Sequence, residues 1–214
     1  DTDKRMAVVS VLRKYIKDSK KIRFEGDGYS DDWVKEAEKR GLANVKDTPR
    51  ALDAYLTKKA KKIFSENLVL TETELDARNE IYWENYVMKI QIESRVMGDL
   101  AMNHIVPTAV AYQNKLITNA NGLKGLGIKN DEVVKSIETI SGYITTIQTE
   151  VHNMIEERKR INKIDDTRDR AIAYCDDVKM KYFDKIRYAV DKLELLVDDE
   201  DWPLTKYREM LFLR

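Results

Sequence analysis

Residues 133–161 read VVKSIETISGYITTIQTEVHNMIEERKRI, and this stretch decides the fold. Its apolar residues recur at alternating intervals of four and three positions, which places them along one side of an α-helix. Such a spacing, sustained over about four heptads, is typical of helices that pack as in a coiled coil. The predicted seam comprises Val133, Ile137, Ile140, Ile144, Ile147, Val151, Met154 and Ile161, and only Arg158 falls out of the pattern.

A second helix with the same spacing is predicted after a break near Lys163–Asp166. Its seam comprises Cys175, Tyr182, Ile186, Ala189, Leu193 and Leu196, with Val178 or Lys179 between. Each of the two helices has about 33 residues and a length of roughly 50 Å. Because their connection is short they must lie antiparallel, and residues 72–120 are long enough to pack along both. We therefore predict an all-α fold: an elongated antiparallel bundle of three long helices with a smaller helical N-terminal region.

Capping residues and helix breakers set the limits of the other helices. The predicted helices cover residues 4–18, 31–40, 49–66, 72–106 and, beyond a bend or break at Pro107, 107–119. The expected N-caps are Ser30, Thr48 (with Pro49 at the first helical position) and Thr71, the last in a capping box with Glu74. Gly41 ends the second helix, and Asn121 to Gly127 form a loop. Ile22–Phe24 is too short to form a sheet alone but could add a strand to a sheet supplied elsewhere.

The C-terminal residues are expected to leave the bundle and return to a surface. The acidic run Asp198–Asp201 opposes the helix dipole, so the last long helix should end near Val197 and another should begin around Pro203. Leu211–Leu213 are too apolar to remain in solvent and should dock on the bundle or on a neighbouring subunit. The apolar residues left over from the seams should also face another surface: Ile92, Ile155, Phe183, Val190, Leu195 and Val197.

Composition excludes several classes of protein. Lys and Arg together number 38, as do Asp and Glu, so the net charge is zero, which argues against nucleic acid or an anionic membrane as partner. A single cysteine, Cys175, fits a reducing compartment, and the chain has no apolar run of 18 residues and no signal peptide. We expect a soluble, cytoplasmic protein. The absence of an initiating Met suggests an excised piece of something longer.

No catalytic, cofactor-binding or metal-binding residue is assigned from the sequence. Di-iron bundles need Glu three residues before His, but Ala101 and Thr149 hold those positions before His104 and His152. His104 is interpreted as a partly buried side chain that donates to a backbone carbonyl freed by Pro107. Two glycine-containing segments, 25–28 and 122–127, lack the context of phosphate loops and are interpreted as a structural turn and a flexible tip. The charges of Glu93, Arg95 and Asp99 are expected on solvated helix faces, and the acids at 198–201 leave a cation site open as a minor alternative.

Three stretches resemble type III glutamine synthetases, the large bacterial form. The most specific is RFEGDGYS at 23–30, continued by WVKEAEKRGL at 33–42 and Thr48-Pro49. The second runs from Glu80 to Gln113 and includes NHIVP at 103–107. The third is LELLVDDE at 193–200 with WPLTKYRE at 202–209. The resemblance covers essentially the whole chain.

The resemblance implies a ligase that joins ammonia to glutamate at the expense of ATP, with Mg or Mn, in a large ring-shaped homo-oligomer. None of the family's metal or phosphate ligands matches a position here, so no cofactor is assigned to this chain. Residues 1–66 would be the helical tail of the catalytic domain and a connecting segment, and 67–214 a long-helix bundle with a C-terminal docking tail. The expected role is structural or in assembly, with the catalytic body and neighbouring subunits as partners. The alternative is a stand-alone helical scaffold or adaptor that binds a partner protein.

Overall fold

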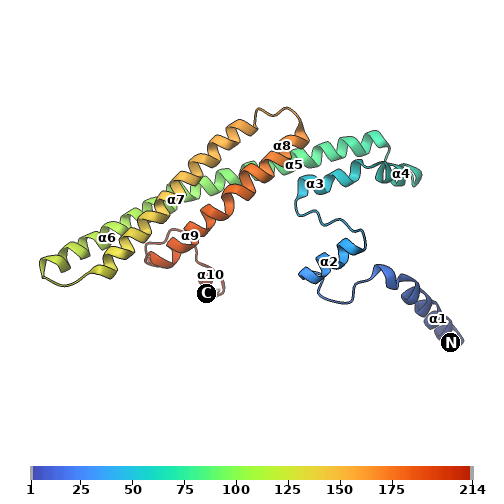
Figure 1. The fold of residues 1–214 in the computed structure, drawn as a ribbon, viewed down its shortest axis with the longest axis horizontal. Helices are drawn as coiled ribbons and strands as arrows, with labels where there is room; N and C mark the ends of the chain where they lie inside the picture. Colours follow the sequence, from blue (N-terminus) through green and yellow to red (C-terminus); the bar gives the residue numbers. More distant parts are fainter. Residues whose placement is uncertain (1, 213–214) are drawn as a thin grey trace. The chain divides into compact units, whose positions relative to one another are not determined.

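The structure is a computed structural model that describes residues 2–212 (Figure 1). Every regular element among these residues is a helix, so the predicted all-α class is confirmed. The chain divides into two compact units, Asp1–Lys46 and Asp47–Arg214. Whether residues 1–66 form one evolutionary domain stays a prediction, but residues 47–66 belong structurally with the long helices that follow them.

The first unit contains helix α1 (Thr2–Asp18), the 3-10 turn η1 (Ser19–Ile22) and helix α2 (Asp31–Lys39). Ser30 caps α2 as predicted, since its hydroxyl accepts a hydrogen bond from the amide of Trp33 at 3.3 Å. Gly41 follows with a φ of 70°, the left-handed conformation that ends a helix. Ile22–Phe24 forms no strand within the described residues, although the backbone of Arg23 is extended.

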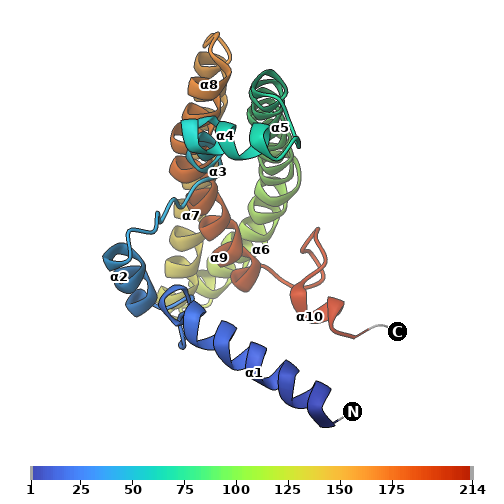
Figure 2. The ribbon, with the colours of Figure 1, turned by 90° about the vertical axis from the view of Figure 1, so that its right-hand side faces the viewer.

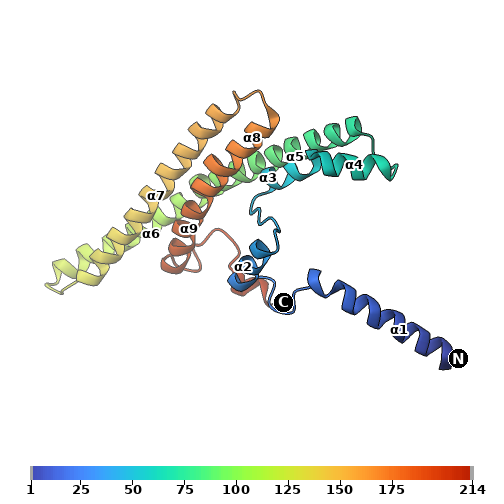
Figure 3. The same cartoon turned by 45° about the vertical axis from the view of Figure 1, so that its right-hand side comes forward.

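The predicted continuous helix from Pro49 to Glu66 is wrong. The structure has α3 (Thr48–Leu52), the 3-10 turn η2 (Asp53–Leu56) and a separate helix α4 (Lys58–Glu66). Thr57 interrupts the run because its hydroxyl caps α4 by accepting from the amide of Ala60. Thr48 is not the N-cap of α3, since the carboxylate of Asp47 accepts the amide of Arg50 at 2.9 Å instead. Figure 3 shows α4 beside the start of the next long helix.

The longest helical segment passes through Pro107 without a break. It consists of α5 (Glu72–Asp99), the π-helix η3 (Leu100–Ile105) and α6 (Val106–Gly125), and begins with the predicted capping box at Thr71. In η3 the amide of Val106 donates to the carbonyl of Ala101, five residues back, so the wider π turn precedes the proline. The predicted end at residue 119 is therefore wrong, and of the two predicted effects of Pro107 a break does not occur, whereas a bend stays a prediction. Helix α6 continues through Gly122 to Gly125, and Gly127, with a φ of 72°, follows the C-cap residue Leu126.

Two further helical segments complete the second unit. They are α7 (Asp131–Ile161) and a segment made of α8 (Thr167–Ala173), the π-helix η4 (Tyr174–Phe183) and α9 (Asp184–Leu196). Helix α7 packs against α6 and α9, while α5 packs against α8 and η4. Figure 1 shows the chain reversing direction between α6 and α7 and again between α7 and α8. Figure 2 shows α3 beside α5 and α8, and α4 beside α5.

The predicted seams lie in the core with a few corrections. From Ile140 to Ile161 every seam residue of α7 is buried, whereas Val133 and Ile137 are half-buried. In the second seam Val178 is buried and Lys179 exposed, which settles the choice between them. Leu196 is exposed, and Val197 takes its place in the core because the helix has ended and the backbone there is extended.

The C-terminal residues differ from expectation. No helix begins near Pro203: an irregular segment leads to the short helix α10 (Tyr207–Met210). Trp202 is buried and packs in the core. Leu211 and Phe212 are 60% and 73% exposed, so within this chain they do not dock on the bundle. Leu213, the third residue of that expectation, lies outside the described residues.

Candidate functional site

The two histidines and the single cysteine differ in their exposure. His104 and His152 are both exposed, so the interpretation of His104 as a partly buried donor is wrong. Cys175 is a buried free thiol. Within residues 2–212 no group of three or more His, Cys, Asp and Glu side chains has the geometry to hold a metal ion. Glu93, Arg95 and Asp99 are exposed, as expected.

The turn at 25–28 holds aromatic rings together. A Cβ atom on Gly26 would lie 2.8 Å from the Phe24 ring, so glycine is needed for the ring to occupy this place. Phe24 in turn packs on Trp33 with ring centroids 4.5 Å apart. The amide of Tyr29 donates to the carboxylate of Asp27 at 2.9 Å. These contacts favour the structural interpretation of this turn.

Lysines engage the acidic run at 198–201. The Lys115 amine lies 2.5 Å from the carboxylate of Asp201, and Lys206 pairs with Asp199. Lys206 also donates to the backbone carbonyl of Glu194 at 2.9 Å. The run therefore ties the irregular segment after α9 to the bundle. Nothing in its arrangement favours a cation site over these ion pairs.

Two bidentate arginine–aspartate pairs hold residues 47–56 against the long helices. Arg168 contacts both carboxylate oxygens of Asp53 at 2.6 and 2.7 Å, and Arg50 contacts both of Asp176 at 3.1 and 2.6 Å. Hydrogen bonding to arginine lowers the pKa of each of these two carboxyl groups. Between the pairs, the buried indole N–H of Trp83 donates to the carbonyl of Pro49 at 3.0 Å.

Polar side chains at the helix interfaces also link the helices. The Tyr174 hydroxyl donates to the side-chain carbonyl of Asn162 at 2.6 Å, and the amide of Gln91 lies 3.0 Å from that same oxygen. Burial raises the pKa of the Tyr86 phenol, and a hydrogen bond with Cys175 adds to the shift. These residues come from separate helices, and their spacing along the sequence does not predict their contact. Their surroundings fix helix packing rather than expose a reactive group.

An apolar groove with a volume of about 640 Å³ opens between α5–η3 on one side and η4–α9 on the other. We call it the α5–α9 groove. Ten of its lining residues are apolar and the remaining two are charged: Ile92, Glu93, Val96, Met97, Leu100, Ala101, Ile105, Phe183, Ile186, Arg187, Val190 and Leu204. Ile92 and Val96 are 54% and 51% exposed and form a ridge on the α5 side.

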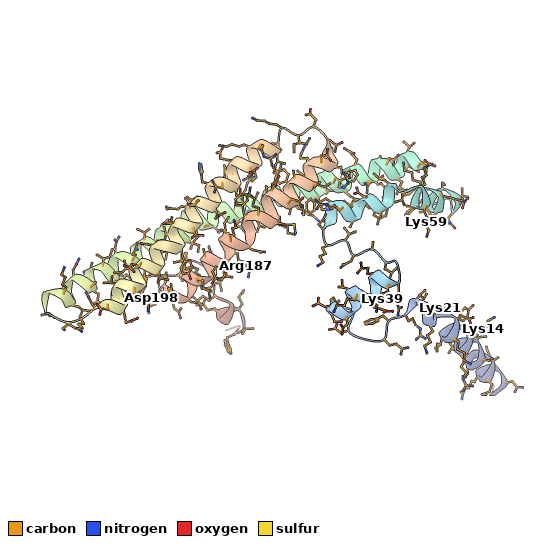
Figure 4. The ribbon with its side chains drawn as sticks, in the orientation of Figure 1. Lys14, Lys21, Lys39, Lys59, Arg187 and Asp198 are labelled. Carbon is orange, nitrogen blue, oxygen red and sulfur yellow. The ribbon has the colours of Figure 1, made fainter. Side chains whose placement is uncertain are left out.

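Helix α1 carries a second unpartnered apolar surface. Every side chain described from Asp3 to Asp18 is exposed, including the apolar set Met6, Val8, Val9, Val11, Leu12, Tyr15 and Ile16. Basic side chains border this set, and Lys14 is labelled on α1 in Figure 4. Helix α1 has 17 residues, and a helix in a protein gains most of its stability from packing of its apolar face rather than from its length. It therefore needs a partner surface beyond those that its own unit, residues 2–46, supplies.

None of the described helices is long and apolar enough to cross a membrane. Neither the two unpartnered surfaces nor the buried polar contacts assemble a nucleophile with a base. The sites that the described residues do offer are surfaces for packing.

Comparison with known proteins places the chain in a family. The profile of the glutamine synthetase C-terminal domain matches residues 7–124. A glutamine synthetase of Bacteroides fragilis (strain YCH46) is 42% identical over 214 residues, which is 97% of this chain and 29% of the relative. The type-3 glutamine synthetase of Dictyostelium discoideum is 31% identical over 96% of this chain and 29% of its own length. A glutamine synthetase of Butyrivibrio fibrisolvens is 28% identical over 96% of this chain, again 29% of the relative.

The chain thus spans less than a third of the relatives that it matches. The similarity extends over both structural units, and its relatives include a protein named as type-3, so the resemblance inferred from the three sequence stretches is confirmed. On this evidence the chain belongs to the glutamine synthetase C-terminal domain family.

Proposed function

We propose that this chain is the C-terminal helical region of a type III glutamine synthetase and that its role is structural, in holding the enzyme's subunits together. On this proposal the ligase reaction takes place in the part of the enzyme that lies outside this chain. ATP and the divalent metal, Mg or Mn, would bind there as well. The proposed setting is a ring-shaped homo-oligomer in the cytoplasm.

The observation that carries the proposal is the exposure of α1. Its apolar side chains, Leu12 and Ile16 among them, are about half exposed although they form a continuous stripe. Such a stripe is stable when another surface covers it. Since the relatives are more than three times as long as this chain, the remaining two-thirds of the parent enzyme can supply that surface. On this view α1 packs on the catalytic body.

The second unit would act as a rigid arm. We propose that α5–η3–α6, α7 and α8–η4–α9 work as one elongated antiparallel bundle of three long helices. The buried seam from Ile140 to Ile161 and the bidentate pair of Arg168 with Asp53 support this stiffness. The alternative of a stand-alone scaffold would use the same surfaces for an unrelated partner.

An immunoblot separates these two possibilities. Residues 1–214 have a mass of 25.0 kDa, and 25.0 kDa at 29% of the whole gives a parent of about 86 kDa. An antibody raised against the chain should detect a polypeptide of that size in cell extract, in the chromatographic fractions that form glutamine from glutamate, ammonia and ATP. The purified chain itself should form none. A native polypeptide of 25 kDa in fractions without this activity would overturn the proposal.

A further inference from the structure

The α5–α9 groove combines a projecting ridge with an adjacent hollow, and the same two helices form both. Ile92 and Val96 lie one turn apart on α5 and are half exposed. Beside them the groove passes between α5 and α9 to Leu204 in the irregular segment. A protein that carries both a ridge and an adjacent groove can pair with a copy of itself, since each copy supplies what the other needs.

The charges of the groove fit a copy of the same chain. Its two charged residues have opposite signs and stand on opposite sides: Glu93 on α5 and Arg187 on α9. Among the described residues Glu93 has no ion-pair partner, and Arg187 makes a single long contact of 3.4 Å with Asp191 on its own helix. The Arg187 side chain is 76% exposed on α9, where Figure 4 labels it. Both charges are therefore available to a partner.

From these observations we infer that the α5–α9 groove is a two-fold contact between two copies of this chain, in which Glu93 of each copy pairs with Arg187 of the other. The ridge of Ile92 and Val96 from one copy lies in the groove of the second. Because Glu93 lies on this ridge, the insertion carries it toward the α9 side of the partner groove, where Arg187 stands. This inference rests on the proposed assembly role and identifies the surface through which two copies would assemble.

Two-fold symmetry accounts for features that a different partner would not need. In a two-fold contact the same pair of residues meets twice, once on each side of the axis. One acidic and one basic residue per copy therefore suffice for complementarity. A strongly charged partner would favour a single sign around the groove. The apolar floor, with Ala101 and Ile105, would be covered by the ridge and removed from water.

The test measures self-association of the 214-residue chain by sedimentation velocity over a range of concentrations. All proteins carry Leu12→Asp and Ile16→Asp, so that the exposed stripe of α1 does not contribute to association. We expect a monomer–dimer equilibrium, with a dissociation constant on the order of micromolar for a contact of modest area. A chain that stays monomeric at concentrations well above that range would overturn the inference.

Charge exchange identifies the contact. Glu93→Arg and Arg187→Glu should each raise the dissociation constant by about tenfold or more, because like charges then meet twice across the two-fold axis. The double variant should return it to within about threefold of the parent value, as expected for directly interacting residues. Two single variants that weaken association with no recovery in the double variant would contradict the pairing. Circular dichroism of the monomers should show equal helix content in all three.

A matched pair of apolar variants tests the ridge. Ile92→Asp should abolish the dimer, whereas Ile63→Asp, at a position 51% exposed on α4 and outside the groove, should leave the dissociation constant within about threefold. A chain that ends at Lys206 should still dimerise. If removal of residues 207–214 abolishes the dimer while the charge variants have no effect, the C-terminal tail is the occupant and the inference is wrong. These outcomes do not depend on glutamine formation, so they are separate from the test of the proposed function.

Discussion

Substituting Ile147 with Ala on α7 tests the core most directly. Ile147 has no exposed surface and lies in the cluster that joins α7 to its neighbours. Ile155 lies two turns further along the same helix, outside the four-three seam, and is 37% exposed. The two positions share residue type and helix, so a comparison of their alanine variants isolates the effect of burial.

The expected magnitudes follow from the burial of the removed atoms. Isoleucine to alanine removes three carbon atoms, each contributing about 0.8 kcal/mol when buried, or about 2.4 kcal/mol in total. At Ile147 the cavity left behind adds to this, so we expect a loss of about 3–4 kcal/mol. At Ile155 about 63% of the side chain is covered, which gives about 1.5 kcal/mol, and the open surface leaves no closed cavity.

Urea unfolding followed by far-ultraviolet circular dichroism measures both variants under the same conditions. The free energy of unfolding should fall by about 2 kcal/mol more for Ile147→Ala than for Ile155→Ala. Equal losses, or a difference below about 1 kcal/mol, would show that the four-three seam does not form the core and that the helix packing is incorrect. Transition slopes should agree with that of the parent, which confirms that the folded states are comparably compact.

Three further predictions use the same unfolding assay or a direct activity assay. Asp53→Asn should cost about 0.5–1 kcal/mol at pH 7, since the partly exposed pair with Arg168 is lost. The lowered pKa of Asp53 means that its contribution is present above the unfolded pKa near 3.8 and disappears as the pH falls through the folded value, so the difference in stability between parent and variant should shrink as the pH is lowered below 3.8. A chain that ends at Lys206 should keep the parent's thermal midpoint within about 2 °C, whereas one that ends at Asp201 loses buried Trp202 and should melt several degrees lower. The purified chain with ATP, magnesium, glutamate and ammonia should form no more glutamine than a blank preparation, and activity above the blank would contradict the proposal that the reaction takes place outside this chain.

The long helices could be predicted because their signal is local and repeated. On α7 the interval pattern places Ile140, Ile144 and Ile147 on one side whatever the neighbours are, and all three are buried. The interval pattern no longer predicts which residues are buried where a helix ends. Leu196 fits the spacing but is exposed. The backbone becomes extended at Val197, so the side chain of Val197 enters the core in place of Leu196.

The short elements and the contacts between distant residues could not be predicted in the same way. Threonine occurs inside helices as well as at N-caps. Thr57 is therefore only a weak signal of the break before α4. The pair of Arg168 with Asp53 joins positions 115 residues apart, and a single sequence carries no trace of their proximity. Pro107 predicts a disturbance of the helix, yet it does not reveal that a π turn at 100–105 will absorb it.

The chain contains more large apolar side chains than its core buries, and the surplus lies on the exposed surfaces. A helix between two neighbours buries one stripe, but α5 has a second set, with Met88, Ile92 and Val96 each about half exposed. The stripe on α1 has the same character, and within its own unit each of the two sets is exposed to water. Selection for a free-standing domain would replace such residues by polar ones at little cost in folding, since they contribute nothing to the core that Ile140 to Ile161 define. We propose that each surface has its own partner: the catalytic body for α1, and a second copy of the chain for the α5–α9 groove.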